Sequence, residues 1–439
     1  MFDKWQKIET PDTLSNKISL YKYDNKEYFL IRHFPFGFAK VKVEYIEEII
    51  KNNLNSKTKT SDELGKFINV ENKIELNNKK HLRRLNLLIV QKCNCRCKYC
   101  YAGEGDYGIA SVMPFEVAKK AIHKAFEYFD FIESIQFFGG EPFLDPQLIE
   151  KIVKYTHSLA IKMNKNIPTF SVVTNLTILP ENILKMVSKK ELAIITSLDG
   201  PENVHNSNRI FASGEGTYNK VVENIKKLTP YNQLKTIQAT YNMKHIEMGI
   251  TPKDIKDHIS KICGDSCNIV VIPDLNLPAE KSIDTSHFEL KYYSGLDFNL
   301  IDREKLKKLL SQYLKVFTKY SAEDVFCDLG ISNFSIDANG KIWACQILCN
   351  KTEPLGNINE NWDLIMNRYK EGLGSKLKKS LFKECKDCFL NKYCTACPIA
   401  WQRRTNKFAP YKEQCELDRK AYLTALRLSL VLQKMEDKC

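Results

Sequence analysis

The sequence Cys93-Asn-Cys-Arg-Cys-Lys-Tyr-Cys-Tyr101 directly follows the apolar run 85–90 and brings several cysteines into one short loop. Three of them, Cys93, Cys97 and Cys100, have the spacing C-x3-C-x2-C, which lets the loop place thiolates at three corners of a cubane iron–sulfur cluster. One iron then lacks a protein ligand, and an open metal position is typical of a catalytic site because a substrate or cofactor must bind there. A zinc site with Cys95 as the fourth ligand, or a group of buried thiols, is the alternative.

Short apolar runs alternate with amphipathic stretches on the carboxyl side of this loop. Strands are predicted at 85–90, 133–138, 168–174, 192–198, 235–241 and 268–272. Helices are predicted at 114–129, 146–163, 181–189, 218–228 and 252–261. Six strand–helix units predict a parallel sheet with right-handed crossovers, either an open doubly wound sheet or a partial barrel. In both arrangements the active site lies at the carboxyl ends of the strands.

Two of the predicted strands end in short glycine-containing segments. The second ends in Phe137-Phe-Gly-Gly-Glu-Pro142, where two glycines permit close approach of the backbone to a ligand. The fourth ends in Thr196-Ser-Leu-Asp-Gly-Pro201, in which the polar residues would otherwise only form a turn. Together with the cysteine loop, these segments resemble the radical S-adenosylmethionine (SAM) enzymes, and Val173-Thr-Asn175 matches a further family segment. The resemblance covers about residues 84–420.

This resemblance implies an α/β fold with a partial (β/α)6 TIM-like barrel, and it implies roles for individual residues. Cys93, Cys97 and Cys100 would hold a catalytic [4Fe-4S] cluster, whose open iron is chelated by SAM; one electron then cleaves SAM to a 5'-deoxyadenosyl radical. The cofactor-binding residues implied are Tyr99 beside the adenine, Gly139, Gly140 and Glu141 at the methionyl amino group, Ser197 at the ribose, and Asp199 in the same segment.

A second group of cysteines lies between residues 327 and 415. Cys327 is followed by Gly340 and Cys345, and then by Cys385-x2-Cys388-x5-Cys394-x2-Cys397 and Cys415. A zinc ribbon would explain the C-x2-C pairs alone, but the whole order resembles the SPASM domain, which carries two auxiliary [4Fe-4S] clusters. The resemblance implies Cys327, Cys345 and Cys397 for the first auxiliary cluster, and Cys385, Cys388, Cys394 and Cys415 for the second.

One spacing of this assignment departs from the family pattern, and one further cysteine lies close to it in the sequence. The last pair has two intervening residues where three are commoner, which bears on Cys397. Cys349 follows Cys345 by four residues, and we expect it to complete the first auxiliary cluster. If Cys349 is instead a buried thiol, one iron stays open and a substrate sulfur could bind it.

The amino-terminal residues contain no cysteine and read as a separate module. Strand-like runs at 18–23 and 28–31 predict a hairpin, a helix follows near 43–50, and a capping box from Thr60 to Glu63 opens a second helix. This order resembles a winged-helix module that recognises a leader peptide by strand addition; a dimerisation or capping module is the alternative. The predicted domains are therefore 1–80 (leader recognition), 81–320 (radical SAM barrel) and 321–439 (SPASM).

Composition and charge limit the classes of partner expected for this 439-residue chain. Its apolar runs are far shorter than the ~20 residues of a membrane span, and Met1–Thr10 has no apolar core of a signal peptide, so we expect a cytoplasmic protein without membrane association. The net charge of +13 is spread over lysine-rich faces without an arginine stripe, which disfavours nucleic acid as partner. Fifteen cysteines without a disulfide-scaffold composition indicate metal binding.

The family resemblance implies a radical SAM enzyme that modifies a peptide. We expect it to install thioether crosslinks, from a Cys sulfur to a carbon, in a ribosomally synthesised precursor peptide. Carbon–carbon crosslinking and formylglycine formation, as in anaerobic sulfatase maturases, are the alternatives, and a tRNA-modifying enzyme is a more distant one. The expected cofactors are SAM and three [4Fe-4S] clusters, and the expected electron donor is a flavodoxin or ferredoxin.

Overall fold

The computed structural model describes residues 5–9, 18–23, 27–32, 37–50, 80–264, 267–275 and 324–386, and most of 388–419. The second amino-terminal helix, predicted to open with the capping box from Thr60 to Glu63, lies outside these residues. No helix of the described ranges is both long and apolar enough to cross a membrane.

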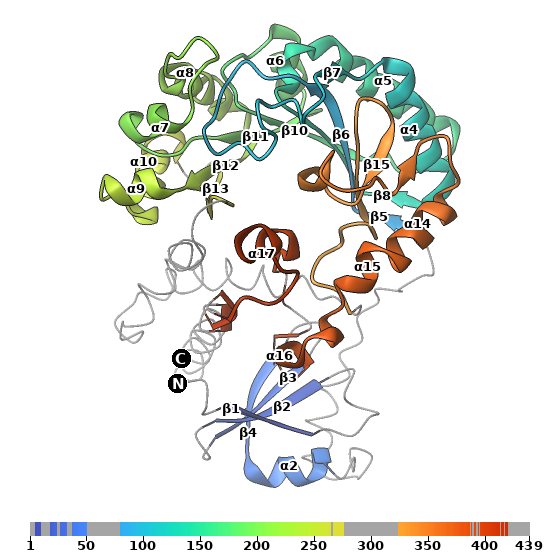
Figure 1. Cartoon of the computed structure of the whole chain (residues 1–439), viewed down its shortest axis with the longest axis vertical. Coiled ribbons are helices and arrows are strands. Elements are labelled where there is room, and N and C mark those ends of the chain that lie inside the picture. The colour runs from blue at the N-terminus through green and yellow to red at the C-terminus, as the bar shows by residue number, and fades with distance from the viewer. Residues whose placement is uncertain are drawn as a thin grey trace.

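Six parallel strands form the centre of the molecule, and all six were predicted from the apolar runs. They are β6 (Arg84–Gln91), β9 (Ser134–Gly139), β10 (Thr169–Thr174), β11 (Ala193–Ser197), β12 (Leu234–Tyr241) and β13 (Asn268–Pro273). Each pairs with the next one along the chain, so the strand order never reverses. An unreversed order is that of a barrel rather than a doubly wound sheet. Figure 1 shows the curved sheet with the helices on its outer face.

The five predicted helices cover this outer face. They are α4 (Phe115–Tyr128), α5 (Pro146–Lys162), α6 (Glu181–Ser188), α8 (Tyr218–Leu228) and α10 (Pro252–Cys263). Their starts follow from local chemistry: the Asp145 side chain accepts a hydrogen bond from Leu148 N at 3.1 Å, and Thr251 forms a capping box with Asp254. Each helix buries one apolar face on the sheet, and each fully buried aliphatic or aromatic side chain contributes about 1.5–3 kcal/mol.

Several short elements of the barrel were not predicted. The helices α7 (Glu202–Asn208) and α9 (Met243–Glu247) follow β11 and β12, and the turn η2 (Pro142–Leu144) follows β9. Short strands β5 (His81–Leu82) and β8 (Phe131–Ile132) pair with each other, and β7 (Ser111–Val112) pairs with the end of β6. All of them lie at strand ends, where they shape the rims of the barrel.

The carboxyl-terminal region continues the sheet of the barrel. β14 (Asn333–Ile336) pairs in parallel with β6, on the side that β9 leaves free, and β15 (Lys341–Trp343) and β16 (Gly356–Asn357) add antiparallel strands. The predicted third domain therefore shares a sheet with the second. Beyond these strands lie helices α14 (Trp362–Glu371), α15 (Leu373–Lys376), η7 (Lys379–Leu381), α16 (Lys383–Lys386) and α17 (Pro398–Thr405).

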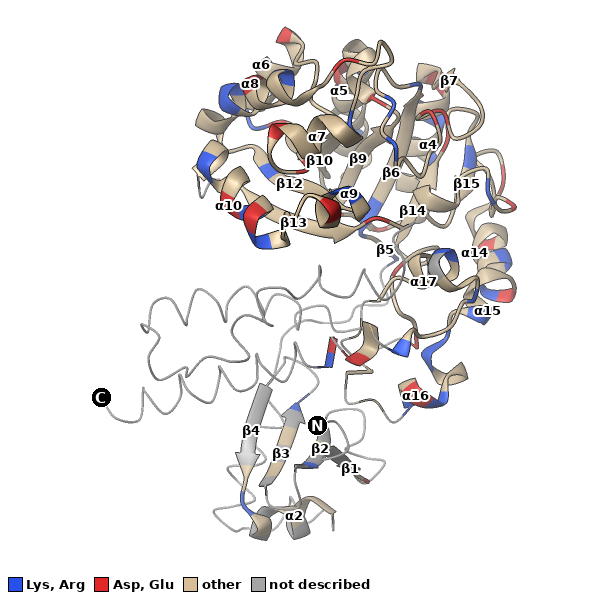
Figure 2. Ribbon diagram, turned by 60° about the vertical axis from the view of Figure 1, so that its left-hand side comes forward, with Lys and Arg blue, Asp and Glu red and all other residues tan. Residues whose placement is uncertain are grey.

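The amino-terminal region forms a sheet of its own, apart from the barrel in both views (Figures 1 and 2). The predicted hairpin is present as β2 (Ile18–Tyr23) and β3 (Glu27–Arg32), and β1 (Trp5–Ile8) and β4 (Gly37–Val41) pair antiparallel on its two sides. The predicted helix is α2 (Val43–Ile50), which buries Ile46 and Ile49 against the sheet.

Charged side chains are mixed over the outer helices of the barrel. Figure 2 shows Lys and Arg interspersed with Asp and Glu rather than gathered on one face. Many of them pair within one helix, as Lys154 does with Glu150 at 2.6 Å and Lys227 with Glu223 at 2.6 Å. Such pairs keep a helix face polar, and each adds little to the free energy of unfolding.

Candidate functional site: the cysteine loop at the carboxyl ends of the strands

The loop after β6 brings Cys93, Cys97 and Cys100 together. All three are half-buried free thiols; Cys93 and Cys100 act electrostatically on Cys97, and Cys93 acts on Cys100. Burial is the main cause that raises the pKa of Cys97 to about 11, and the neighbouring Cys100 and Cys93 add to it. Thiols whose pKa is raised by burial and by a neighbouring thiolate, as those of Cys97 and Cys100 are, are suited to a cationic metal centre, which would hold them as thiolates.

Cys93 is the member of this set that is most readily a thiolate. A hydrogen bond from the Cys95 thiol is the largest cause that lowers the pKa of Cys93 to about 6, against burial; hydrogen bonds from Cys95 N and the Asn175 amide help. Cys95 N donates to Cys93 Sγ at 3.4 Å, and Asn175 Nδ2 donates to Cys93 Sγ at 3.7 Å. The thiolate is the form that binds a metal.

A backbone ladder holds the cysteine loop against the segment 208–212. Arg96 N donates to Ile210 O at 2.8 Å, and Lys98 N donates to Asn208 O at 3.0 Å. Cys95 is buried, and its backbone forms an antiparallel bridge with Phe211. This position gives Cys95 a structural place in the ladder, in line with its interpretation as a cysteine outside the ligand set.

Glycines let the loop lie directly on the end of β9. A Cβ on Gly140 would lie 2.3 Å from both Lys92 O and Gly105 O, and a Cβ on Gly105 would lie 2.4 Å from Cys93 Cβ. Gly105 also has a φ of +85°, which side chains other than glycine rarely adopt. Gly139 and Gly140 therefore serve the packing of the loop backbone as well as any approach to SAM.

Glu141 follows these glycines, and its carboxylate is buried among protein donors. It accepts hydrogen bonds from Phe143 N at 2.8 Å, Thr174 Oγ1 at 2.8 Å and Asn175 N at 2.7 Å. Burial raises the pKa of Glu141 to about 7, although these bonds favour the ionised form. The carboxylate thus joins the ends of β9 and β10, and the backbone of Gly139 and Gly140 is the part of the segment left to meet a ligand.

Tyr99 and Asp199, both predicted as cofactor-binding residues, contact each other. Tyr99 Oη donates to Asp199 Oδ2 at 2.5 Å, and the other oxygen of Asp199 accepts from Thr240 N at 3.0 Å. Burial raises the pKa of Tyr99 well above its usual value, so the phenol stays protonated and remains a donor. Ser197, at the end of β11, is half-buried and lies in register with Gln238 of β12.

Arg209 completes this group and was missed from the sequence. Its Nη1 donates to Tyr99 Oη at 2.8 Å, and its guanidinium lies 5.9 Å from the centre of the Tyr99 ring. Burial opposes its charge, but Cys97, Tyr99 and Asp199 raise the pKa of Arg209 above its usual value. A buried cation beside one of the three loop cysteines offsets the negative charge that thiolates bring.

Two neutral histidines hold the backbone of Asp199. His205 Nδ1 accepts from Asp199 N at 3.2 Å, while its Nε2 lies 2.9 Å from Thr217 Oγ1, which itself donates to Arg209 O. His245 Nε2 lies 2.8 Å from Asp199 O. Burial, followed by the charge of Arg209, lowers the pKa of His205 to about 3, so the ring is neutral at ordinary pH.

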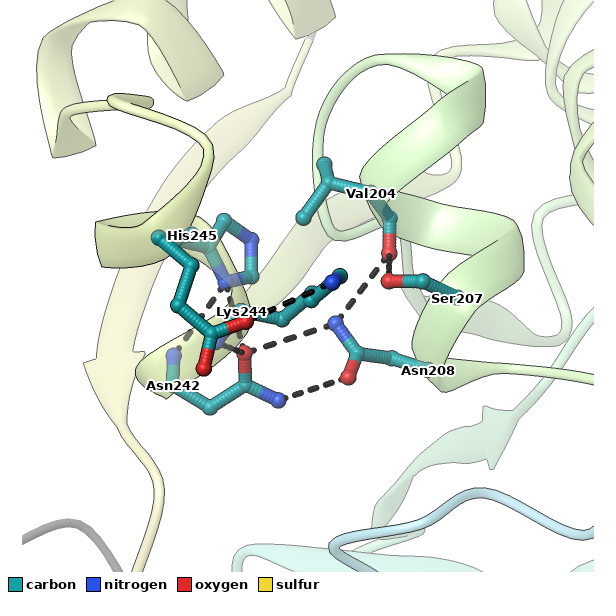
Figure 3. Close-up of polar contacts among 7 residues, drawn as sticks. Val204, Ser207, Asn208, Asn242, Lys244 and His245 are labelled. Atoms are coloured by element: carbon teal, nitrogen blue, oxygen red, sulfur yellow. Dashed lines mark hydrogen bonds and ion pairs between the residues drawn. The ribbon is translucent and has the colours of Figure 1, made fainter.

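A pair of buried amides connects this network to the cysteine loop (Figure 3). Asn242 Nδ2 donates to Asn208 Oδ1 at 2.8 Å, and Asn208 Nδ2 donates to Asn242 Oδ1 at 3.4 Å. Asn242 N also donates to His245 Nδ1 at 3.2 Å. Because Asn208 O accepts from the loop residue Lys98, the amide pair fixes α7 and the loop to the end of β12.

Electrostatic interactions among the carboxyl-terminal cysteines fall within two groups, and their assignment as cluster ligands stays a prediction. The charges of Cys397 and Cys345 act on Cys327, and that of Cys397 acts on Cys345; burial is the largest cause that raises the pKa of both Cys327 and Cys345 to about 12. In the second set, Cys394 and Cys388 act on Cys385, and Cys394 and Cys385 act on Cys415.

Cys349 belongs to a different apolar core from the one that Cys327 and Cys345 pack against. It is fully buried in a small core with Trp343, Ala102 and Tyr107, beside the cysteine loop. The charged neighbours that act on it, after burial itself, are Asp337, Lys341 and Lys351, with no cysteine among them in the described part of the chain. Ligation of the first auxiliary cluster by Cys349 stays a prediction.

The donor chemistry fits iron–sulfur clusters. The cysteines of the described ranges are all free thiols. Within those same ranges, no three His, Cys, Asp or Glu side chains converge closely enough to hold a single metal ion. Zinc needs such convergence on one point, whereas a cubane spreads its ligands over separate irons.

Comparisons with known proteins agree with this geometry. A family model described as the radical SAM superfamily matches residues 87–260. An uncharacterized protein of Methanocaldococcus jannaschii is 30% identical over 169 residues, which is 38% of this chain and 56% of that protein. The chain therefore matches little more than half the length of this relative.

Two relatives are matched over more of their length. The cysteine-type anaerobic sulfatase-maturating enzyme of Clostridium novyi is 25% identical over 311 residues, covering 64% of this chain and 78% of that protein. The enzyme of the same name from Clostridium perfringens strain 13 is 26% identical over 329 residues, covering 69% and 84%.

A solved structure shows the same fold. Native anSMEcpe with bound AdoMet superposes with a TM-score of 0.63 at 18% identity, and the match covers 80% of this chain and 99% of that one. The residues matched by the family model include most of β6, the cysteine loop and the strand ends around it. Residues 87–260 of this chain therefore match the radical SAM superfamily, and the fold is that of the solved relative.

Proposed function

We propose that this protein is a SPASM-type peptide maturase that joins a Cys sulfur to a carbon of a ribosomally made precursor peptide. The observation that supports the proposal is that electrostatic interactions link Cys327, Cys345 and Cys397, and likewise Cys385, Cys388, Cys394 and Cys415. Two auxiliary clusters give a route for the electron that such a crosslink releases. The sulfatase-maturating relatives support modification of a polypeptide.

The chain's own residues set the geometry of the reaction. Bound at the cysteine loop, a [4Fe-4S] cluster with SAM would supply a 5'-deoxyadenosyl radical. Cys93, Cys97 and Cys100 would hold that cluster, and Arg209 and Asp199 orient Tyr99 beside it. Forming the thioether removes a hydrogen atom from the substrate carbon, a proton from the thiol and one electron. The auxiliary clusters would receive that electron and pass it to a flavodoxin or ferredoxin.

The amino-terminal sheet supports a peptide with a leader as substrate. Strands β1 and β4 are the outer strands of this four-stranded sheet. An extended leader could pair with such an edge through main-chain hydrogen bonds. A cytoplasmic location follows from the proposal, because cluster thiolates need a reducing compartment.

Formylglycine formation is the second candidate. The names of the two clostridial relatives favour it, since their matches extend over most of their own length. Carbon–carbon crosslinking would use the same cysteine sets. The three reactions differ in the fate of sulfur and hydrogen, so the product mass separates them.

The test is anaerobic incubation of the enzyme with SAM, reductant and a short Cys-rich peptide encoded beside its gene. A thioether is expected to remove two hydrogens per crosslink, block alkylation of the cysteine and release 5'-deoxyadenosine. Loss of two hydrogens with a free thiol would indicate a carbon–carbon bond, and replacement of sulfur by oxygen together with loss of two hydrogens would indicate formylglycine. An unchanged peptide mass during SAM cleavage would contradict all three.

Cysteine variants separate the role of the catalytic cluster from that of the auxiliary clusters. Cys93→Ala is expected to abolish SAM cleavage, whereas Cys385→Ala is expected to preserve cleavage and stop product formation. Cys267→Ala, outside every proposed ligand set, is the matched control and should preserve both. Normal product from Cys385→Ala would contradict the role of the auxiliary clusters.

A further inference from the structure

Lys379 is a fully buried lysine beside the second set of carboxyl-terminal cysteines. Only 1% of its surface is exposed, although lysine is among the residues least often buried. Transfer of an ammonium group out of water is costly unless nearby groups compensate its charge. The position therefore calls for a compensating environment.

Local structure fixes this lysine firmly. Lys379 N donates to Asp324 O at 3.2 Å, and Ser380 N donates to the Asp324 side chain at 2.9 Å, so Asp324 holds the turn η7. The Lys379 ammonium donates to Asn391 O and lies 5.7 Å from the centre of the Phe326 ring. Phe326 packs edge-on against Trp401 at 4.9 Å. The ammonium is thus placed by its surroundings and cannot swing into solvent.

The cysteines that surround this ammonium belong to the set of four. The charge of Lys379 lowers the pKa of both Cys385 and Cys394, against the larger effect of burial. Phe326, Cys385 and Cys394 also belong to one packed core. The thiols and the ammonium therefore share a water-poor region, where a charge interacts more strongly than at a surface.

Arg419 approaches the same set from another element. Its side chain hydrogen bonds to Cys388, and Cys388, Cys415 and Cys385 raise the pKa of Arg419 against burial. Two carboxylates act in the opposite direction: Glu384, which is exposed, and Asp418, which is half-buried. Solvent and salt screen the charge of the exposed Glu384 more strongly than the charge of the buried Lys379.

We propose that Lys379, assisted by Arg419, is the counter-charge of the second auxiliary cluster and sets its reduction potential. The inference rests on the proposed function, which places a cluster at Cys385, Cys388, Cys394 and Cys415. Four thiolates around a cubane core of charge 2+ carry a net charge of about −2, and reduction adds one more negative charge. A buried cation stabilises the reduced form more than the oxidised form, so it raises the potential and makes this cluster the electron acceptor.

The test compares reduction potentials of anaerobically reconstituted full-length protein by EPR redox titration. The signal that changes on addition of SAM belongs to the catalytic cluster, and the signal lost in Cys388→Ala belongs to the second auxiliary cluster. Lys379→Met is expected to lower the reduced fraction of this second signal at a fixed potential by at least tenfold, a shift of about 59 mV for one electron. Lys379→Arg should restore most of it.

Lys378→Met is the matched control, because Lys378 is the exposed neighbour of Lys379 and should leave the potential unchanged. Lys379→Met with full iron content and an unchanged potential would overturn the inference and leave Lys379 a purely structural residue. If Lys379→Met does not retain the second cluster, Arg419→Gln takes its place: a lower potential supports the counter-charge, and an unchanged one overturns it. Wild-type protein with iron for one cluster only would instead refute the proposed auxiliary clusters themselves.

Discussion

The cysteine loop at the barrel and the cysteine set of the carboxyl-terminal region each lie beside a buried cation, but they hold it differently. Arg209 contacts Tyr99 and is surrounded by Asp199 and Cys97, in a network that reaches β11 and β12. Lys379 contacts a carbonyl and an aromatic ring within its own region. The comparison indicates that the first cation orients other side chains, whereas the second acts through its charge.

The cysteine loop and the set of four also differ in what supports their backbone. The loop 93–100 is hydrogen-bonded through its backbone to the segment 208–212 and packs on the glycines at the end of β9. The set of four relies on short elements such as α16 and on the aromatic core around Phe326. The loop should therefore keep its shape without iron, while the set of four should depend on its cluster.

The largest effect is expected from Gly105→Ala. The new Cβ would overlap Cys93 Cβ, so the loop must shift and about four irons should be lost, with SAM cleavage abolished. Gly108→Ala is the matched control, because Gly108 has a similar φ of +81° but nothing within 4 Å of its Cβ position. Iron analysis and EPR should show the auxiliary signals unchanged in both variants. Equal behaviour of the two variants would contradict the packing argument.

Arg209→Gln should have the next largest effect. Removing one partner of a buried charge pair costs about 3–5 kcal/mol, here because Asp199 stays buried. The free energy of urea unfolding should fall by this amount, and SAM cleavage should fall with it. Arg209→Lys should recover part of the stability. A loss no larger than the ~1 kcal/mol of a surface pair would place Arg209 outside the network.

A pH dependence is expected from His205. Its pKa is lowered from 6.5 to about 3 in the folded protein, so below pH 6.5 the unfolded chain binds a proton that the folded chain does not. Stability should fall as the pH drops from 6.5 towards 3, by about 1.4 kcal/mol per pH unit at most. The difference in unfolding free energy between wild type and His205→Gln isolates this contribution. A pH-independent difference would refute it.

The smallest effect is expected from the amide pair Asn208–Asn242. A double-mutant cycle of Asn208→Ala and Asn242→Ala should give a coupling energy on the order of 1 kcal/mol, measured by urea unfolding. Ser207→Ala is the control, since Ser207 bonds only within α7, to Val204 O at 2.7 Å. Paired with Asn242→Ala, it should show no coupling. Zero coupling between the two asparagines would show that the pair does not fix the loop to β12.

The sequence allowed the prediction of elements with a clear apolar period. All six barrel strands and the five helices between them are confirmed within a few residues, because each buries a regular apolar face. The helix α7 was missed because its sequence Glu-Asn-Val-His-Asn-Ser-Asn is polar; it buries His205 and Asn208 through hydrogen bonds. β14 is four residues long and depends on pairing with a distant strand.

Some residues of the candidate site could be predicted from the sequence, and others could not. Cysteine spacing and strand-end segments predicted the loop cysteines, Tyr99 and Asp199, and the structure places these close together. Arg209, Asn208 and Asn242 carry no local signal, since a single Arg or Asn in a polar stretch is usually solvated. Their burial arises only after the chain has folded. Cys349 was grouped by spacing with Cys345, but tertiary packing places it in another core.

The pairing of β14 with β6 has a consequence for folding during synthesis. Asn86 Nδ2 donates to Ser335 Oγ at 3.2 Å, although the two residues are 249 positions apart. β6 is the strand that leads into the cysteine loop. Until β14 has been synthesised, the edge of β6 that β14 later covers has no partner strand. Such late, non-local pairing slows folding and leaves an edge exposed to other chains. Cluster insertion is therefore expected to be a late, post-translational event.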